Sequence, residues 1–295
     1  MRALVGVDWG TSSLRAARIA GDGTVLEERA SARGILAVPA GGFPAVLQET
    51  CGDWLAGDAL CLVSGMAGSR QGWQEAPYCP CPAGFGELAS ALAWITPGRI
   101  ALVPGLSCET DGVPDVMRGE EVQVFGAMDL LALHGGSFVL PGTHSKWVEV
   151  ADGRVRHFAT AMSGEVYALL RKQSILARTL SPDDESLDSE AFLRGVRAAQ
   201  SAGSLLRSAF GTRTLALFDR VAPAPLASYL SGLVIGEELR ARPANVHDEV
   251  VLVGSPALTA RYALALQSLG CGSRSLGAEA TWRGLWSLAR ALEER

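Results

Sequence analysis

The chain has 295 residues, of which 48% are hydrophobic and 19% are charged, and its formal net charge is -5. This composition is typical of a folded globular protein long enough for two domains, and it excludes a disordered chain. The acidic balance and the lack of a basic tail give no reason to expect a nucleic-acid partner. No stretch approaches the ~18 consecutive apolar residues that a membrane span needs.

The N-terminus and the cysteines indicate a cytoplasmic protein. The first ten residues become acidic at Asp8 and do not have the pattern of a secretory signal peptide. The six cysteines show no disulfide framework, and Cys79 and Cys81 have no second Cys or His pair at zinc-ligand spacing. We therefore expect reduced thiols and no metal held by cysteine.

The first half of the chain begins with a strand, a tight polar turn formed by Gly10, Thr11, Ser12 and Ser13, and a second strand. Apolar runs and hydrophobic spacing predict the further elements of this half. The expected strands are 2–8, 14–19, 24–26, 59–63 and 99–103, and the expected helices are 43–55 and 118–133.

The same pattern starts again near the middle of the chain. A polar turn formed by Gly142, Thr143, His144 and Ser145 lies between expected strands at 137–141 and 146–150, and a hairpin leads to a third strand at 154–158. This repeat predicts a duplicated unit with lobes at 1–134 and 135–295. The rest is expected to form helices at 164–176, 188–202, 203–218, 225–240, 256–269 and 278–292 and strands at 249–253 and 273–276, an α/β class with mixed sheets.

Each of the two turns has the chemistry of a phosphate-binding site. Glycine lets the backbone approach an anion closely, and successive N–H groups and hydroxyls point at it. Asp8, at the end of the first strand, suits a magnesium ion that keeps most of its waters. The competing interpretation is two ordinary hairpins with polar turns. Other nucleotide motifs are absent: the sequence has neither a G-x-x-x-x-G-K-[ST] loop nor a G-x-G-x-x-G loop between a strand and a helix.

Several segments resemble known motifs. Residues 8–15 (DWGTSSLR) resemble the first phosphate motif of the actin–hexokinase–Hsp70 superfamily. Residues 140–147 (LPGTHSKW) resemble the second phosphate motif of one branch, the 2-dehydro-3-deoxygalactonokinase family. The resemblance to this branch extends nearly end to end, through GMAGSRQGW (65–73), EAPY (75–78), DVMRGEEVQ (115–123) and YLSGLVIGE (229–237).

The resemblance implies a two-lobe actin-like ATPase (ribonuclease H-like) fold with duplicated mixed β-sheets and an interlobe cleft. It implies transfer of the γ-phosphoryl of ATP, with Mg²⁺, to the 6-hydroxyl of 2-dehydro-3-deoxy-D-galactonate in galactonate catabolism. The first lobe would supply a phosphate turn, the substrate loop and the base, and the second lobe the other turn and the adenosine pocket. A small-molecule sugar acid and ATP are the expected partners, and a homodimer is one expected assembly.

The base that orients the acceptor hydroxyl is expected among three carboxylates. Sugar kinases of the superfamily commonly place it at the start of a helix in the first lobe, and Asp115 suits this position best because it precedes the predicted helix at 118–133. Glu120 and Glu121 are alternatives, and Asp111 is in reserve. Asp115 as a helix N-cap, and the two glutamates as a solvated first-turn pair, are the competing structural interpretations.

The anionic substrate needs a cation, and the planar guanidinium of arginine matches a carboxylate. Arg70 and Arg118 are the candidates, and Trp73 and Tyr78 are candidates for packing on the sugar chain. Surface arginines and core aromatics are the corresponding alternatives.

On the nucleotide side, Lys146 is a candidate for a phosphate contact, with a solvent-facing strand residue as the alternative. For His144 we favour a role as a hydrogen-bonding residue of the turn over a role in acid–base catalysis. Gly254 and Ser255 resemble the adenosine-side loop, although a plain strand–loop–helix junction would look the same. Leu140 occupies the place that matches Asp8 in the first motif, so magnesium would depend on Asp8 alone.

Two rival functions keep the same fold. One is a kinase of another sugar acid or sugar, and the other is a non-catalytic sugar-acid sensor. A sensor would be expected to have lost the acids of the first lobe, which this chain retains. A filament-forming protein is a third alternative and would carry large apolar self-association patches.

Overall fold

The computed structural model describes residues 3–181, 186–201, 203–241 and 249–294, so one end of the expected elements 2–8 and 188–202 lies outside the described residues. The chain divides into two compact units. The first comprises Met1–Phe138, Trp147–Ala159 and Leu276–Arg295, and the second comprises Val139–Lys146 and Thr160–Ser275. Two segments expected in the second lobe, Trp147–Ala159 and the C-terminal helix, belong to the first unit in this division. The division of roles between lobes stays a prediction.

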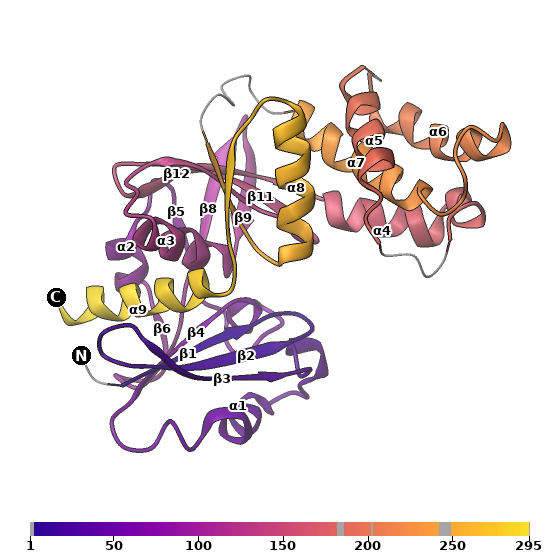
Figure 1. The fold of residues 1–295 in the computed structure, drawn as a ribbon. Helices are drawn as coiled ribbons and strands as arrows, with labels where there is room; N and C mark the ends of the chain where they lie inside the picture. Colours follow the sequence, from indigo (N-terminus) through magenta and orange to yellow (C-terminus); the bar gives the residue numbers. More distant parts are fainter. Residues whose placement is uncertain (1–2, 182–185, 202, 242–248, 295) are drawn as a thin grey trace. The chain divides into compact units, whose positions relative to one another are not determined.

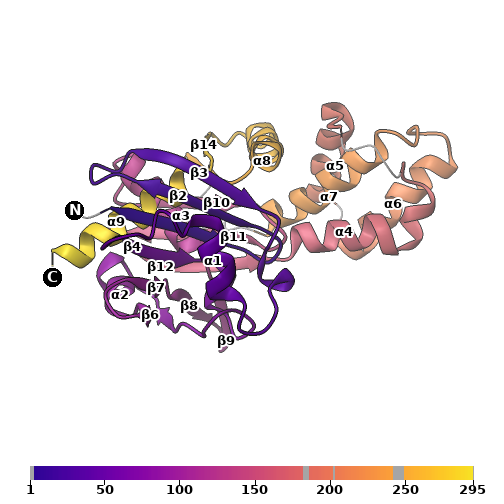
Figure 2. The ribbon, with the colours of Figure 1, turned by 90° about the horizontal axis from the view of Figure 1, so that it is seen from below.

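A six-stranded mixed sheet forms the centre of the first unit (Figures 1 and 2), with the strand order β3-β2-β1-β4-β7-β6. The first three strands form antiparallel neighbours, and β4 lies parallel to β1. The strands are β1 (Leu4–Trp9), β2 (Leu14–Ile19), β3 (Val25–Ser31), β4 (Leu60–Ser64), β6 (Ala93–Thr96) and β7 (Ile100–Leu102). This arrangement brings the ends of β1 and β4 side by side, where the first polar turn begins.

Helices α1 (Phe43–Cys51) and α9 (Glu279–Glu293) lie on opposite faces of this sheet (Figure 1). Alternation along β1 explains the two layers, because successive side chains of a strand point to opposite faces. Val5 and Val7 belong to the core cluster on the α1 face. Gly6 faces α9, where a Cβ would lie 3.0 Å from the Leu285 side chain.

A small three-stranded sheet with the order β5-β8-β9 also belongs to the first unit, together with α2 (Phe85–Ser90) and α3 (Glu120–Leu130). Its strands are β5 (Tyr78–Pro80), β8 (Gly105–Thr110) and β9 (Val113–Met117). The sequence patterns did not predict these strands or α2.

The second sheet repeats the order of the first, which confirms the mixed-sheet α/β class and supports the duplication. Its order is β12-β11-β10-β13-β14, so that its first four strands correspond to β3-β2-β1-β4. The strands are β10 (Gly136–Leu140), β11 (Ser145–Ala151), β12 (Arg154–Ala161), β13 (Val250–Val253) and β14 (Ser273–Leu276).

Helices make up most of the second unit. They are α4 (Ser163–Gln173), α5 (Ser189–Ser201), α6 (Leu205–Leu217), α7 (Leu226–Arg240) and α8 (Pro256–Ser268). Helix α7 is the central one, with thirteen of its fifteen residues buried. Within the described residues, no helix is both long enough and apolar enough to cross a membrane.

Candidate active site

The first polar turn joins β1 and β2 through a hydrogen bond from the Gly10 N–H to the Ser13 carbonyl at 2.9 Å. Thr11, Ser12 and Ser13 are exposed, so their hydroxyls and backbone are accessible to an anion. The turn rests on Gly34, where a Cβ would lie 2.3 Å from the Thr11 carbonyl oxygen. The sequence analysis did not identify Gly34, because a contact over more than twenty residues leaves no local pattern.

Asp8 lies beside this turn, in register with Arg15 on β2 and Ser64 on β4. Its Oδ2 accepts a hydrogen bond from Arg15 Nη2 at 2.5 Å. Its Oδ1 lies next to Gly65, where a Cβ would come within 3.4 Å of that oxygen and 2.9 Å of the Trp9 carbonyl oxygen. Gly65 has a φ of +90°, so both its conformation and its surroundings require glycine. Glycine at position 65 therefore places no side chain beside Asp8 Oδ1.

The start of α3 lies close to the same place. Gly119, which precedes the helix, has a φ of +104°, and a Cβ on it would lie 3.2 Å from the Gly65 Cα. The two glutamates of the first turn hold the chain here. Glu120 Oε2 accepts from the Arg118 N–H at 3.0 Å, and Glu121 Oε2 accepts from the Gly119 N–H at 2.7 Å. The predicted glutamates thus lie near Asp8, at the beginning of a helix.

The two glutamates differ in environment. Glu121 is fully buried, and its Oε1 has no hydrogen-bond partner among the described residues. Burial, and then repulsion from Glu120, raise the pKa of Glu121 from 4.5 to about 8. Glu120 is half-buried, so it keeps contact with solvent.

Asp115 lies elsewhere. It is in the middle of β9, paired in register with Cys108, and its Oδ1 accepts from the Val116 N–H at 2.7 Å. The prediction that it marks a helix start, or forms an N-cap, is wrong: α3 begins at Glu120, and its N-cap is Gly119. The segment 113–117 pairs with β8 instead of winding into a helix. Asp111 lies in the turn between β8 and β9, with a φ of +52°.

Arg118 and Tyr78, two of the four predicted substrate residues, lie together. The Arg118 guanidinium stacks over the Tyr78 ring at 4.3 Å from its centroid, and Nη2 donates to the Ala76 carbonyl at 2.8 Å. Arg118 is buried, while its Nε and Nη1 have no hydrogen-bond partner in the described structure. A buried guanidinium with unused donors is suited to a carboxylate ligand.

The other two substrate candidates have different surroundings. The Arg70 side chain is 85% exposed and pairs with Glu75 through Nε at 2.8 Å. Trp73 packs against the core of the first unit, stacked on Phe43 with ring centroids 6.2 Å apart. For Trp73 the structure therefore agrees with the alternative interpretation, a core aromatic.

The second polar turn, between β10 and β11, is supported from below by the start of α4. A Cβ on Gly164 would lie 2.3 Å from the Gly142 carbonyl oxygen, so only glycine allows the turn to lie this close to the helix. The Glu165 N–H donates to the Thr143 carbonyl at 3.0 Å. The His144 ring Nε2 is 2.6 Å from Glu165 Oε2, in keeping with the expected hydrogen bond of that histidine in the turn.

Ser145 and Lys146, which follow the turn, are buried. The Ser145 hydroxyl donates to Glu238 Oε1 at 2.8 Å, and Lys146 Nζ donates to the Thr160 hydroxyl at 2.8 Å. A solvent-facing Lys146 is therefore excluded.

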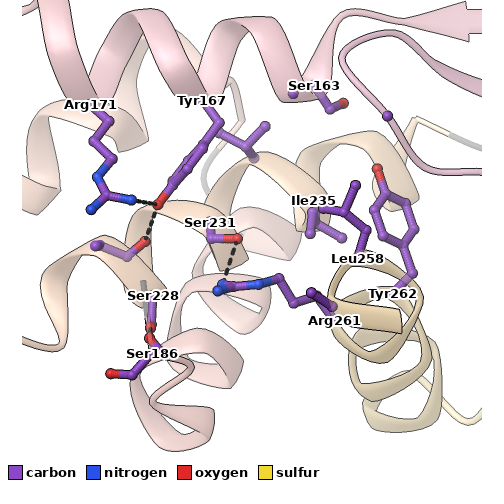
Figure 3. Close-up of a pocket in the computed structure, with 15 residues that line it drawn as sticks. Ser163, Tyr167, Arg171, Ser186, Ser228, Ser231, Ile235, Leu258, Arg261 and Tyr262 are labelled. Carbon is purple, nitrogen blue, oxygen red and sulfur yellow. Dashed lines mark hydrogen bonds between the residues drawn. The ribbon is translucent and has the colours of Figure 1, made fainter. Parts of the chain in front are cut away.

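A pocket of about 260 Å³ opens beside the second turn (Figure 3). Its walls come from α4, α7 and α8, and the turn contributes Gly142. Arg171 approaches the Tyr167 hydroxyl at 3.4 Å, and Arg261 donates to the Ser231 hydroxyl at 3.3 Å. The remaining lining residues are small, hydroxylic or aliphatic: Ser163, Gly164, Ser186, Ala227, Ser228, Val234, Ile235, Ala257, Leu258 and Tyr262.

The predicted adenosine-side loop lies at one edge of this pocket. Ser255 is the N-cap of α8, and the next helical residues, Ala257 and Leu258, line the pocket. Gly254 lies close to the second turn, because a Cβ on it would be 3.5 Å from the Pro141 carbonyl oxygen. The loop, the pocket and the second turn are thus contiguous within the second unit.

Comparison with known proteins identifies the family. The family model described as 2-keto-3-deoxy-galactonokinase matches residues 8–288. The chain belongs to this family. A relative from Rhizobium meliloti (strain 1021), described as a 2-dehydro-3-deoxygalactonokinase, is 38% identical over 97% of this chain and 96% of its own. The 2-dehydro-3-deoxygalactonokinase of Escherichia coli (strain K12) is 34% identical over 98% of each chain.

Solved structures agree with this assignment. A crystal structure from Sinorhizobium meliloti, described as a 2-dehydro-3-deoxygalactonokinase, has a TM-score of 0.91 at 36% identity over 98% of this chain and 99% of that one. Component A of the (R)-2-hydroxyglutaryl-CoA dehydratase of Acidaminococcus fermentans has a TM-score of 0.55 at 12% identity over 100% of this chain and 99% of its own. The second likeness concerns the fold alone, and it confirms the expected actin-like ATPase class.

Proposed function

We propose that this chain transfers the γ-phosphoryl of ATP to the 6-hydroxyl of 2-dehydro-3-deoxy-D-galactonate, giving the 6-phosphate and ADP. The observation that carries the proposal is the family match over residues 8–288, with named relatives 34–38% identical over nearly their whole length. As a member of a kinase family, the chain uses ATP and a sugar-acid acceptor. The position of the acceptor hydroxyl, the metal and the residue roles below are the finer parts of the proposal.

The mechanism is one of positioning and charge stabilisation, as in phosphoryl transfer generally. The acceptor hydroxyl gives its proton to a carboxylate while its oxygen forms a bond to the γ-phosphorus. The bond between that phosphorus and the bridging oxygen breaks, and ADP leaves. Exposed hydroxyls and N–H groups of the two polar turns are suited to hold the phosphates.

The surroundings of Asp8 fit a magnesium ion. Mg²⁺ usually takes one or two carboxylates and otherwise keeps water and phosphate oxygens. Asp8 provides one carboxylate, and Gly65 places no side chain beside its Oδ1. No group of three or more His, Cys, Asp or Glu side chains suited to a metal occurs in the described residues, and Asp8 is the carboxylate that lies beside the first turn. Bound there, magnesium would neutralise charge on the phosphates.

For the base we favour Glu120. A general base has to come within hydrogen-bond reach of the hydroxyl, and half-buried Glu120 is accessible whereas buried Glu121 is not. Glu120 also lies in the first turn of a helix near Asp8. Glu121 would then hold the helix start through the Gly119 N–H and so keep Glu120 in place.

For the substrate carboxylate we favour Arg118. Its guanidinium keeps two donor nitrogens, Nε and Nη1, without a hydrogen-bond partner in the described structure, and the Tyr78 ring fixes the plane of the guanidinium. Tyr78 is 39% exposed and offers an aromatic face beside that site. Arg70 is the reserve candidate on the exposed loop.

The pocket beside the second turn is our candidate for the adenosine. Ligand pockets are commonly of ~300–1,000 Å³, mostly apolar, with a few polar groups that fix orientation. At about 260 Å³, with aliphatic walls and two arginines, this pocket is small but of the right kind for an adenine and its ribose. Gly142 belongs both to the lining of this pocket and to the turn that would hold the phosphates, so the adenine site and the phosphate site would adjoin.

The proposal is tested by a coupled assay of ADP release with ATP and Mg²⁺. The acceptors are 2-dehydro-3-deoxy-D-galactonate, its gluconate epimer and a neutral hexose. We expect release that depends on the acceptor and is strongest with the galactonate form. Release with another acceptor alone would retain the kinase and change the substrate. Binding of ATP without release for any acceptor would overturn the proposal in favour of a sugar-acid sensor.

A further inference from the structure

Glu238, near the end of α7, is a buried carboxylate that accepts hydrogen bonds from three hydroxyl groups. Ser145 donates to its Oε1 at 2.8 Å, Tyr262 donates to its Oε2 at 2.7 Å, and Ser163 also donates to Oε2. Hydrogen bonds to an ionised acceptor are stronger than neutral ones, and burial strengthens them further. Glu238 therefore holds these three hydroxyl groups in fixed positions.

The three donors come from three different parts of the nucleotide site. Ser145 ends the second polar turn, Ser163 begins α4, and Tyr262 belongs to α8. In Figure 3, Ser163 and Tyr262 lie at the same end of the pocket, with the Tyr262 hydroxyl directed toward the start of α4. One carboxylate thus links the turn, the helix start beneath the turn and a wall of the pocket.

The link through Ser163 has a further effect on the turn. Ser163 precedes Gly164, whose backbone is so close to the Gly142 carbonyl that a Cβ would not fit. A shift of the α4 start would therefore shift Gly142 as well. Glu238 holds the turn directly at Ser145 and indirectly through the surface on which the turn rests.

We propose that Glu238 is a positioning residue for the nucleotide, which sets the second polar turn relative to the pocket wall. The inference rests on the proposed function, in which this turn and this pocket bind ATP. Glu238 would act through Ser145 and Ser163 without touching the ligand. Its loss should weaken nucleotide binding and leave the sugar-acid site unchanged, because Arg118 and Tyr78 belong to the first unit.

The test is Glu238→Gln, which keeps the shape but turns one acceptor oxygen into an NH₂ donor. At least one of the three hydroxyls then loses its acceptor. We expect the Kd for a non-hydrolysable ATP analogue, measured by titration calorimetry, to rise about tenfold or more, as for a hydrogen bond lost to a charged group. The KM for the sugar acid should stay within about twofold of the wild-type value. Glu238→Asp, which keeps the carboxylate on a shorter side chain, should recover part of the affinity.

The neighbouring residue provides a matched control. Glu237 pairs with Arg240 on the helix surface at 2.5 Å, so Glu237→Gln makes the same chemical change one residue away and should leave both constants unchanged. Each variant is checked for its melting temperature. If Glu238→Gln lowers the melting temperature but leaves the Kd of the analogue at the wild-type value, Glu238 is only structural and the inference is overturned. A rise in the sugar-acid KM equal to the rise for ATP would overturn it too.

These outcomes are distinguishable from failure of the proposed function. If the wild-type protein phosphorylates no sugar acid, the calorimetric comparison of wild type with Glu238→Gln still reports on nucleotide positioning. If the wild-type protein does not bind the analogue at all, both the function and the inference fall.

Discussion

At the scale of single residues, the sequence ranks Asp115 first among three carboxylates of the first unit. Their environments in the structure give a different order. Asp115 is in a strand of the small sheet, Glu121 is fully buried, and Glu120 is half-buried at the beginning of α3. Accessibility and helix position together favour Glu120 as the group that accepts the proton of the acceptor hydroxyl.

This ranking predicts that Glu120→Gln lowers kcat by about 10²–10⁴-fold, the usual contribution of a general base. The amide cannot accept the proton, while its shape preserves the hydrogen bond from the Arg118 N–H. Asp115→Asn is the matched control and should leave kcat within a few-fold of the wild type. The measurement is steady-state ADP release at saturating ATP and sugar acid. The reverse pattern, with Asp115→Asn inactive and Glu120→Gln active, would reassign the base.

A second prediction concerns the stability of the protein and the protonation of Glu121. Burial, and then repulsion from Glu120, raise the pKa of Glu121 to about 8, against 4.5 for the unperturbed group. Between these values the folded protein keeps a proton that the unfolded chain has released. The stabilisation from this group is therefore full below about pH 4.5, declines as the pH rises and is lost above about pH 8.

Glu121→Gln cannot ionise, so it should remove this decline. We expect the unfolding free energy of the wild type, measured by urea titration relative to that of Glu121→Gln, to fall by several kcal/mol from pH 5 to pH 8.5. Each unit of pKa difference corresponds to ~1.4 kcal/mol. Glu28→Gln on exposed β3 should follow the wild-type pH profile. A difference between wild type and Glu121→Gln that stays constant with pH would mean that Glu121 is not protonated in the folded state.

At the scale of secondary-structure elements, close helix pairs depend on reciprocal glycines. In the α3–α9 pair, a Cβ on Gly126 would lie 1.8 Å from the Ala280 carbonyl oxygen, and one on Gly284 would lie 2.0 Å from the Val122 carbonyl oxygen. The α5–α7 pair has the same arrangement at Gly195 and Gly232. Because α3 carries Glu120 and Glu121, its close contact with α9 fixes the place of the proposed base.

Gly284→Ala should therefore destabilise the protein by about 1–3 kcal/mol or more, since the obstructing atoms are backbone and cannot move aside singly. Gly86→Ala in α2 is the control. A Cβ there meets nothing within 4 Å, and the better helix propensity of alanine should add up to ~1 kcal/mol of stability. Chemical denaturation of both variants measures the two effects. Equal stabilities for the two variants would show that the helices separate at little cost.

The elements also show what the sequence could and could not predict. The two strand–turn–strand units were predictable because glycine and hydroxyl residues follow apolar runs at both places. The small sheet was not, because Pro80 and Pro114 argue against strands, and proline is tolerated only at sheet edges. Strands β5 and β9 are indeed the two edges of that sheet. Missing β9 led directly to the wrong position for Asp115.

The contacts that complete the site are less accessible to sequence reasoning. Glu238 contacts Ser145 across 93 positions of the chain, and Gly34 supports Thr11 from a separate loop. In a helix whose residues are almost all buried, nothing local distinguishes Glu238 from Glu237. Only the fold shows that Glu238 is buried among three hydroxyl groups, whereas Glu237 pairs with Arg240.

At the scale of the whole molecule, the C-terminal helix α9 belongs to the first unit, although the second unit precedes it in the chain. It buries Trp282, Leu285 and Trp286 against that unit. Asp129 of α3 also binds it, accepting from Arg283 Nε at 2.5 Å and from the Ser287 hydroxyl at 2.6 Å. Folding of the first unit is therefore expected to require helix α9.

A chain that ends at residue 275 should consequently not fold its first unit. Full burial of each large apolar side chain is worth ~1.5–3 kcal/mol, so the three lost here are comparable with the ~5–15 kcal/mol that stabilises a typical domain. A chain that ends at Glu293 keeps the whole of α9 and should unfold like the full-length protein. Urea unfolding followed by circular dichroism measures both chains, and a peptide of residues 276–295, added to the shorter one, should restore part of the cooperative transition. A cooperative transition of full amplitude in the chain that ends at residue 275 would instead show that the first unit folds without α9.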